Sequence, residues 1–101
     1  MELKPGTRLR SQVCTAEVIV VKAPGEAVDL CCGGAPLVAI DDDGAARPID
    51  DAHRGGTLLG KRYADEATGI ELLCTKAGEG SLSLGAEPLP VKEAKPLPSS
   101  D

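Results

Sequence analysis

Short apolar runs, separated by glycine, proline and acidic residues, follow one another along the chain. The clearest run, residues 13–21, consists mostly of β-branched residues, which favour strands. Leu82 and Leu84 alternate with two serines, the pattern of a strand that buries one face. No segment repeats its apolar residues with the spacing of a helix. The pattern therefore predicts an all-β fold of six or seven short strands.

Turn signals between the apolar runs predict how these strands connect. Pro24-Gly25 separates the first run from a returning strand, which gives a first hairpin. Asp65-Glu66 marks a second turn, and the glycines of residues 77–80 mark a third. The expected strands cover residues 13–21, 27–31, 37–40, 57–63, 69–76 and 81–84, with a last edge segment between Pro88 and Pro90. We expect two hairpin units in a small antiparallel barrel or sandwich.

The remaining segments are expected to be irregular. Residues 4–10 are polar, and residues 32–36 contain two glycines that permit positive φ and a proline that cannot donate to a ladder. Residues 41–56 are acidic and glycine-rich, which indicates a surface loop. We therefore expect one β domain over residues 1–91 and a polar, proline-containing tail over residues 92–101.

A weak internal repeat supports the two-unit prediction. Cys14-Thr15 precedes two strands and then the sequence Gly33-Gly34-Ala35-Pro36-Leu37. Cys74-Thr75 precedes a shorter version that ends in Gly85-Ala86-Glu87-Pro88-Leu89. In this alignment Leu84 and Gly85 stand where the first copy has Cys32 and Gly33. The repeat predicts two related units packed together.

Composition and charge restrict the function. The chain has 101 residues with no Phe, no Trp and a single Tyr, so its core must come from aliphatic residues and a metal cross-link would help it. The net charge of -5 argues against nucleic acid and against an anionic membrane surface as partners. Without a signal peptide or a membrane-length apolar run, we expect a cytoplasmic protein, in which cysteines are more often metal ligands than disulfides.

Four cysteines are the main candidates for a functional site. Cys14 lies near the start of the first expected strand, and Cys31-Cys32 ends its hairpin partner, so the predicted hairpin places them together. Adjacent side chains on a strand point to opposite faces, which favours Cys32 over Cys31 as the neighbour of Cys14. Thiolates that converge from separate segments bind zinc or iron. Packed or reactive thiols and a disulfide are the alternatives.

Residues 11–37 resemble desulforedoxin and the desulforedoxin-like N-terminal domain of desulfoferrodoxin. The resemblance lies in Ser11-Gln12-Val13-Cys14, the apolar strand that follows, and Leu30-Cys31-Cys32-Gly33-Gly34. It implies one iron held by four sulfurs and the transfer of single electrons. The first cysteine of the family pattern is Ser11 here, so the implied site lacks one thiolate. Cys74, water, His53 or a carboxylate such as Glu17 would complete the shell. The single histidine argues against superoxide reductase activity.

The sequence thus predicts a small non-enzymatic protein with one zinc or iron ion bound by Cys14, Cys32, Cys74 and Cys31. The ion would have a structural or an electron-transfer role. The alternative is an accessory subunit or adaptor of a larger bacterial enzyme, with no catalysis of its own. In either case a protein partner is expected, a second copy of the chain or a larger enzyme. A reactive-cysteine enzyme is a third reading.

Overall fold

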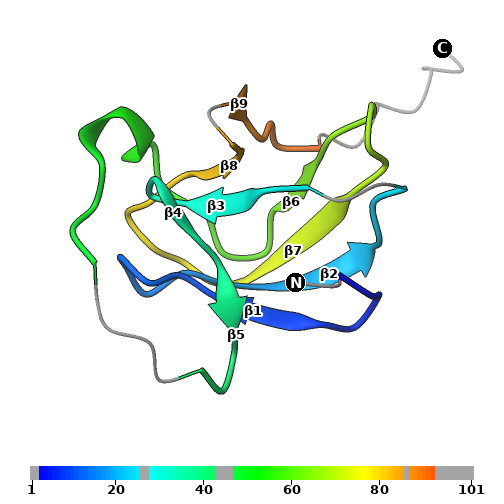
Figure 1. The fold of residues 1–101 in the computed structure, drawn as a ribbon, viewed down its shortest axis with the longest axis horizontal. Helices are drawn as coiled ribbons and strands as arrows, with labels where there is room; N and C mark the ends of the chain where they lie inside the picture. Colours follow the sequence, from blue (N-terminus) through cyan, green and yellow to red (C-terminus); the bar gives the residue numbers. More distant parts are fainter. Residues whose placement is uncertain (1–2, 26–27, 43–46, 86, 93–101) are drawn as a thin grey trace, which may run out of the picture.

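The computed structural model describes residues 3–25, 28–42, 47–85 and 87–92. It confirms the all-β prediction, because short antiparallel strands form two sheets (Figure 1). The elements are β1 (Arg8–Arg10), β2 (Glu17–Lys22), β3 (Leu30–Cys32), β4 (Ala35–Pro36), β5 (Val38–Ala39), the 3-10 helix η1 (Asp51–His53), β6 (Arg62–Ala64), β7 (Glu71–Lys76), β8 (Leu82–Leu84) and β9 (Glu87–Pro88).

The two sheets differ in size and share one core. Sheet A has the strand order β5-β1-β2-β7-β6, and sheet B has the order β4-β3-β8-β9. Buried side chains from both sheets, such as Val18 and Leu72 of sheet A and Leu82 of sheet B, belong to one hydrophobic cluster. A sandwich of two packed sheets is therefore the architecture, and no closed barrel forms among the described strands.

The first predicted hairpin is wrong. β2 pairs with β1 and β7 in sheet A, whereas β3 pairs with β4 and β8 in sheet B. The loop at residues 77–80 likewise leads from β7 in sheet A to β8 in sheet B. Pro24-Gly25 does follow the end of β2, as predicted. Such a turn signal specifies only where a strand ends, whereas the packing of apolar faces decides which strand pairs with it. The hairpin of β6 and β7 around residues 65–69 is present as expected.

Four other local predictions need correction, and the first is that residues 32–36 are irregular, because β3 ends at Cys32 and β4 covers Ala35–Pro36. Strand β1 lies within residues 4–10, a segment predicted to be irregular. A strand forms there because Leu9, 0% exposed, alternates with two arginines that are not buried. Residues 57–61 contribute one isolated bridge at Thr57, and the strand begins only at Arg62. The alternation with Leu82 and Leu84 predicts an exposed Ser83, but Ser83 is 0% exposed and lies opposite Cys31 of β3 and Pro88 of β9. Its hydroxyl donates a hydrogen bond to the Gly85 carbonyl at 3.0 Å.

The two units of the chain follow the same path. The first unit (β1–β4) and the second unit (β6–β9) each begin in sheet A and end in sheet B, and the central pairs β2·β7 and β3·β8 join them. The pairing is reciprocal: Glu17 lies opposite Lys76, and Lys22 lies opposite Glu71. The two units are therefore related by an approximate two-fold axis, although their bounds differ from those of the predicted repeat.

The register corrects the alignment of the repeat. Val18 lies opposite Leu9 in the first unit, as Leu72 lies opposite Tyr63 in the second, so Cys74 corresponds to Val20 and not to Cys14. The turns that precede the central strands also match: the Ser11 N–H donates to the Ala16 carbonyl, and the Asp65 N–H donates to the Ile70 carbonyl. In this register Thr68 is the counterpart of Cys14. The predicted match of Cys32-Gly33 with Leu84-Gly85 agrees with the strand pairing.

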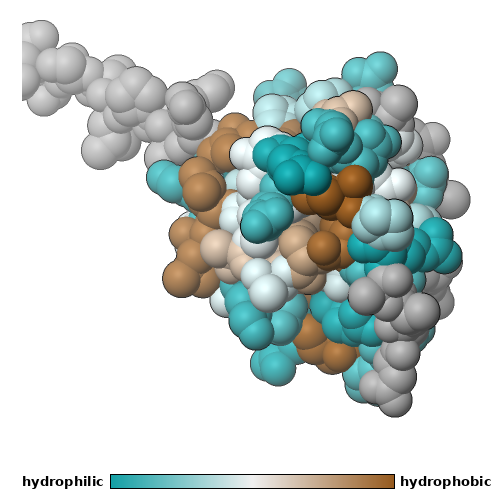
Figure 2. Space-filling view, turned by 90° about the vertical axis from the view of Figure 1, so that its left-hand side faces the viewer, coloured by the Kyte–Doolittle hydropathy of each residue, from teal (hydrophilic) through white to brown (hydrophobic). Residues whose placement is uncertain are grey.

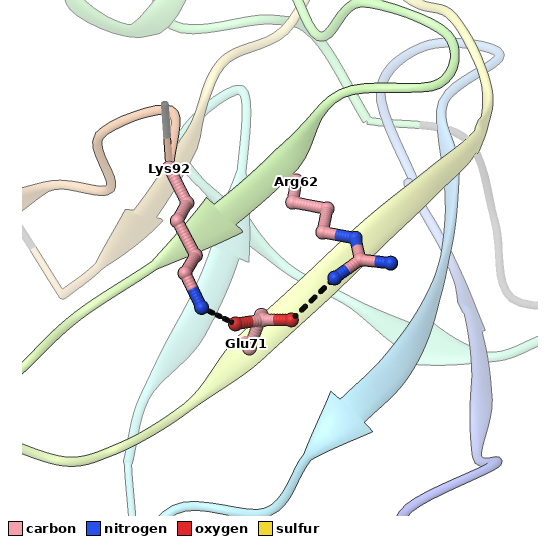
Figure 3. A network of polar contacts seen from close by, with 3 residues as sticks. All are labelled: Arg62, Glu71 and Lys92. Atoms are coloured by element: carbon pink, nitrogen blue, oxygen red, sulfur yellow. Dashed lines mark hydrogen bonds and ion pairs between the residues drawn. The ribbon is translucent and has the colours of Figure 1, made fainter. Parts of the chain in front are cut away.

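A buried carboxylate fixes the last described residues to sheet A. Figure 3 shows Glu71 between Arg62 and Lys92. The Glu71 side chain is 3% exposed. The Lys92 Nζ lies 2.6 Å from one carboxylate oxygen, and the Arg62 guanidinium lies 3.4 Å from the other. The hydrogen bond from Lys92 lowers the pKa of Glu71 despite its burial, and the charges of Lys92, Lys22 and Arg62 lower it further. Lys92, the first residue of the predicted tail, is thus bonded to sheet A, and residues 93–101 lie outside the described residues.

In the described ranges the structure contains no helix with the length and apolar character that crossing a membrane requires.

Candidate functional site

Cys14 and Cys32 lie side by side at one end of the sandwich. Cys14 belongs to the turn of residues 11–16 between β1 and β2, and Cys32 is the last residue of β3. Their sulfur atoms are 4.0 Å apart. The predicted proximity therefore exists, but the packing of sheet A on sheet B produces it, and the expected hairpin does not. In Figure 1 the turn after β1, the turn after β3 and the connection before β8 all approach the left-hand side.

The backbone of two glycines makes the turn after β3 possible. Gly33 and Gly34 have φ values of 64° and 88°, a region that other residues rarely adopt. A Cβ atom on Gly33 would lie 2.2 Å from the Val13 side chain. The turn that carries Cys14 therefore packs directly on the backbone next to Cys32.

Ser11 is a buried third member of this group. Its hydroxyl oxygen accepts the backbone N–H groups of Val13 and Cys14, both at 3.1 Å, and it lies 3.3 Å from the Cys14 sulfur. The residue is 3% exposed. Two convergent N–H groups form a cradle for an electron-rich atom, which is how metal-binding turns support their thiolates. Ser11 occupies the position at which the desulforedoxin pattern has its first cysteine, and its oxygen lies beside the Cys14 sulfur.

The loop that precedes β8 closes the site. The Gly80 N–H donates to the Cys14 sulfur at 3.4 Å. A Cβ atom on Gly78 would lie 2.6 Å from the Cys14 sulfur, and one on Gly80 would lie 3.2 Å from the Cys32 sulfur. Thr57 holds the loop in place, because its hydroxyl donates to the Gly80 carbonyl at 2.6 Å and lies 4.0 Å from the Cys32 sulfur. The glycines of residues 77–80 could have indicated this close approach from the sequence alone.

The two thiols differ in acidity. Burial acts to raise the pKa of Cys14, but hydrogen bonds with Ser11, with the Ala16 and Gly80 backbone and with Cys32 outweigh it, so the pKa is lowered. Burial, together with the charge of a Cys14 thiolate, raises the pKa of Cys32 to about 12. Cys14 is partly exposed, whereas Cys32 is 0% exposed. Cys14 is therefore the thiol that ionises first and that solvent reaches first.

Cys31 and Cys74 do not join this pair in the structure. Cys31 points to the opposite face of β3, where its sulfur lies 3.7 Å from the Asp29 carboxylate, and burial and the Asp29 charge raise its pKa. Cys74 lies in the same hydrophobic cluster as Cys32, but its thiol donates to the Lys76 carbonyl at 3.2 Å. Burial raises the pKa of Cys74, and the charge of Cys14 also contributes.

The other suggested ligands also stay outside the pair. Glu17 forms an ion pair with Lys76 at 3.7 Å. His53 ends η1, and its carbonyl accepts the Ser81 N–H at 2.8 Å, which places its backbone near the loop that precedes β8. Within the described residues, no group of three or more His, Cys, Asp and Glu side chains has an arrangement that could hold a metal ion.

The surface at this end of the molecule is mixed in character. Figure 2, which views the left-hand side of Figure 1, shows mostly hydrophilic atoms with separate apolar areas between them. Leu58 and Leu59, in the loop that follows Thr57, are 57% and 66% exposed.

Comparison of the chain with family models, with curated proteins and with solved structures found no match.

Proposed function

We propose that the chain binds one zinc or iron ion at the Cys14–Cys32 pair. The observation that supports this proposal is the sulfur separation of 4.0 Å. Metal–sulfur bonds of about 2.3 Å in tetrahedral geometry place two thiolates roughly 3.8 Å apart, so the pair fits an ion with little movement. A zinc ion would supply a cross-link, and an iron ion would also carry single electrons.

Two further residues could complete the ligand shell. The Ser11 oxygen lies 3.3 Å from the Cys14 sulfur, near enough to share an ion with it. Cys74 would supply a third sulfur if its thiol left the Lys76 carbonyl, at the cost of one hydrogen bond. Without Cys74, solvent completes the shell. Cys31 is excluded from the proposed shell because its side chain points to the opposite face of β3.

The proposed role of the ion is mainly structural. Cys14 belongs to a turn of sheet A and Cys32 to a strand of sheet B, so an ion between them would join the two sheets. The core has no Phe or Trp, and cross-links contribute most where buried apolar area is limited. Metal binding releases the thiol protons, so the affinity should fall as the pH falls.

The test is metal binding by the purified, chelator-treated chain. Zinc titration against a competing chelator should give one site, and iron loading should give the visible absorption of iron–thiolate bonds if iron binds. Cys14→Ala and Cys32→Ala should abolish binding. Cys31→Ala is the matched control, because it removes the neighbouring thiol on the opposite face, and it should bind like the wild type. Equal loss in all three variants, or no binding by the wild type, would contradict the proposal.

The second candidate function is binding to a protein partner, which is either a second copy of the chain or a larger enzyme of which the chain is an accessory subunit. The observation in its favour is the exposed pair Leu58 and Leu59. Thr57, which precedes them, contacts the Cys32 sulfur, so a partner on this loop would lie beside the site. Sedimentation over a range of concentrations tests the homodimer form of this proposal. Leu59→Ser should weaken any self-association, whereas Ile40→Ser, on another exposed apolar residue, should not.

A further inference from the structure

We propose that Cys14 and Cys32, when no metal is bound, form a reversible disulfide through exchange with a small-molecule disulfide such as glutathione disulfide. This inference goes beyond metal binding and does not depend on it. It rests on the separation of the two sulfurs, on their unequal access to solvent and on the contacts that the other two thiols make elsewhere.

The geometry leaves a short path to the disulfide. The sulfur atoms are 4.0 Å apart, and a disulfide requires about 2.05 Å between sulfurs with Cβ atoms roughly 3.8 Å apart. Cys14 lies in a turn outside the regular strands, and Cys32 is followed by two glycines. Rotation of the two side chains with a small adjustment of the turn would therefore bring the sulfurs together.

The other cysteines have no equivalent neighbour. The Cys31 thiol contacts Asp29, and the Cys74 thiol contacts the Lys76 carbonyl from within strand β7. Among the four cysteines, all of which lie in the described residues, Cys14 and Cys32 are the pair whose sulfur atoms are in contact. The structure therefore favours one of the six pairings that four cysteines allow.

Access decides the order of the two steps. Cys14 is partly exposed, and Cys32 is 0% exposed directly behind it. The Cys14 thiolate attacks one sulfur of glutathione disulfide, the sulfur–sulfur bond of the reagent breaks, and one glutathione leaves. Cys32 then attacks the Cys14 sulfur, the mixed disulfide breaks, and the second glutathione leaves with the proton from Cys32. Two electrons pass from the cysteine pair to the reagent, which is reduced to two thiols.

Gly80 assists the first step. Its N–H donates to the Cys14 sulfur at 3.4 Å. The Cys14 thiol donates to the Ser11 hydroxyl oxygen at 3.3 Å, and once the thiol loses its proton this hydroxyl can donate to the sulfur in turn. Such donors stabilise the negative charge that the attacking sulfur carries. Because residues 78 and 80 are glycines, neither position places a side chain against the two sulfurs.

The experiment uses the full chain in the presence of a chelator, so that metal binding plays no part. After incubation with glutathione disulfide, the number of free thiols is counted and the mass and the linked peptides are determined. The wild type should retain two of four thiols, lose the mass of two hydrogens and yield a peptide that links Cys14 to Cys32. Dithiothreitol should reverse the change.

Variants separate this pair from the others. Cys31→Ala and Cys74→Ala should still form the bridge, and Cys31→Ala removes the ambiguity between the two adjacent cysteines. Cys32→Ala should stop at one glutathione attached to Cys14, because the resolving thiol is absent. The proposal is wrong if the wild type keeps four free thiols, or if its bridge contains Cys31 or Cys74. The wild-type map alone decides this even if a variant fails to fold.

Discussion

Ser11 shows how much a single atom can change the character of a site. Its oxygen accepts two backbone N–H groups and lies beside the Cys14 sulfur, so the cradle exists and holds oxygen in place of sulfur. Zinc and iron(II) both accept thiolates readily, whereas a neutral hydroxyl is a weak ligand. The replacement therefore predicts weaker metal binding than a site with a third thiolate would have.

Ser11→Cys is the direct test of this residue. The added sulfur should lie near those of Cys14 and Cys32, and zinc should bind at least tenfold more tightly, a change of about 1.4 kcal/mol. Chelator competition measures it. Thr75→Cys is the control, because it adds a thiol on an exposed position of β7 and should leave the zinc affinity unchanged. An equal gain in both variants would show that the position of the new sulfur does not matter.

The position of Cys31 relative to Cys32 could be predicted from the sequence. Successive side chains of a strand point to opposite faces, and the structure has the two thiols on opposite faces of β3. The role of Ser11 as an acceptor of two N–H groups could not be predicted, because it depends on the closure of residues 11–16 by the Ala16 carbonyl. The position of Cys74 could not be predicted either. The predicted alignment of Cys74 with Cys14 relied on a shared Cys-Thr dipeptide, whereas the strand pairing matches Cys74 with Val20.

At the scale of elements, the two turns after β3 and β8 form a natural pair for comparison. Gly33 and Gly85 occupy equivalent positions with φ values of 64° and 59°. A Cβ on Gly33 would collide with Val13, whereas one on Gly85 would meet nothing within 4 Å. The same backbone strain is therefore present at both positions, and only the surroundings differ.

Alanine at these two glycines separates strain from packing. Gly85→Ala should destabilise the chain by about 1–2 kcal/mol, the cost of a left-handed residue. Gly33→Ala should cost about 1–3 kcal/mol more, because the turn that carries Cys14 must move. Urea unfolding measures both. Equal losses would mean that residues 11–16 do not pack against the β3–β4 turn.

The ion pairs of Glu71, which attach Lys92 to sheet A, should make the stability of the chain depend on pH. The pKa of Glu71 is lowered on folding, so its contribution to stability is present above the ordinary carboxyl pKa and is lost as the pH falls through the lowered value. Lys92→Gln should therefore reduce stability at neutral pH by about 1 kcal/mol or less, since Lys92 is 47% exposed, and should have less effect in acid.

Lys76→Gln is the matched control for this pair. Its partner Glu17 is 33% exposed, whereas Glu71 is 3% exposed, so its loss should matter less at neutral pH. Urea unfolding of both variants at neutral and acidic pH checks the prediction. A Lys92→Gln defect that stays constant with pH would contradict the assignment to Glu71.

At the scale of the whole molecule, the all-β class could be predicted, and so could the match between the turns after Cys32 and Leu84. The pairing of the strands within and between the two units could not. β-branched runs and glycine turns indicate strands and their ends, and they do so locally. Whether β2 pairs with β3 or with β7 depends on which apolar faces cover one another, which is a property of the complete core.

The two-fold relation predicts that neither unit folds alone. Each central strand pair, β2·β7 and β3·β8, takes one strand from each unit, so a separate unit would leave both strands unpaired on one side. Separate peptides for the two units should show little strand signal by circular dichroism, and their mixture should recover it. A folded first unit by itself would contradict this reading of the fold.

Tyr63 gives the molecule its own optical reporter. It is the single tyrosine of a chain without tryptophan, so its ultraviolet emission comes from one known place and is not transferred to an indole. The ring is buried, and its hydroxyl accepts the Leu58 N–H at 2.9 Å, next to the threonine that touches Cys32. Changes at the sulfurs should therefore be readable from the fluorescence of the unlabelled chain.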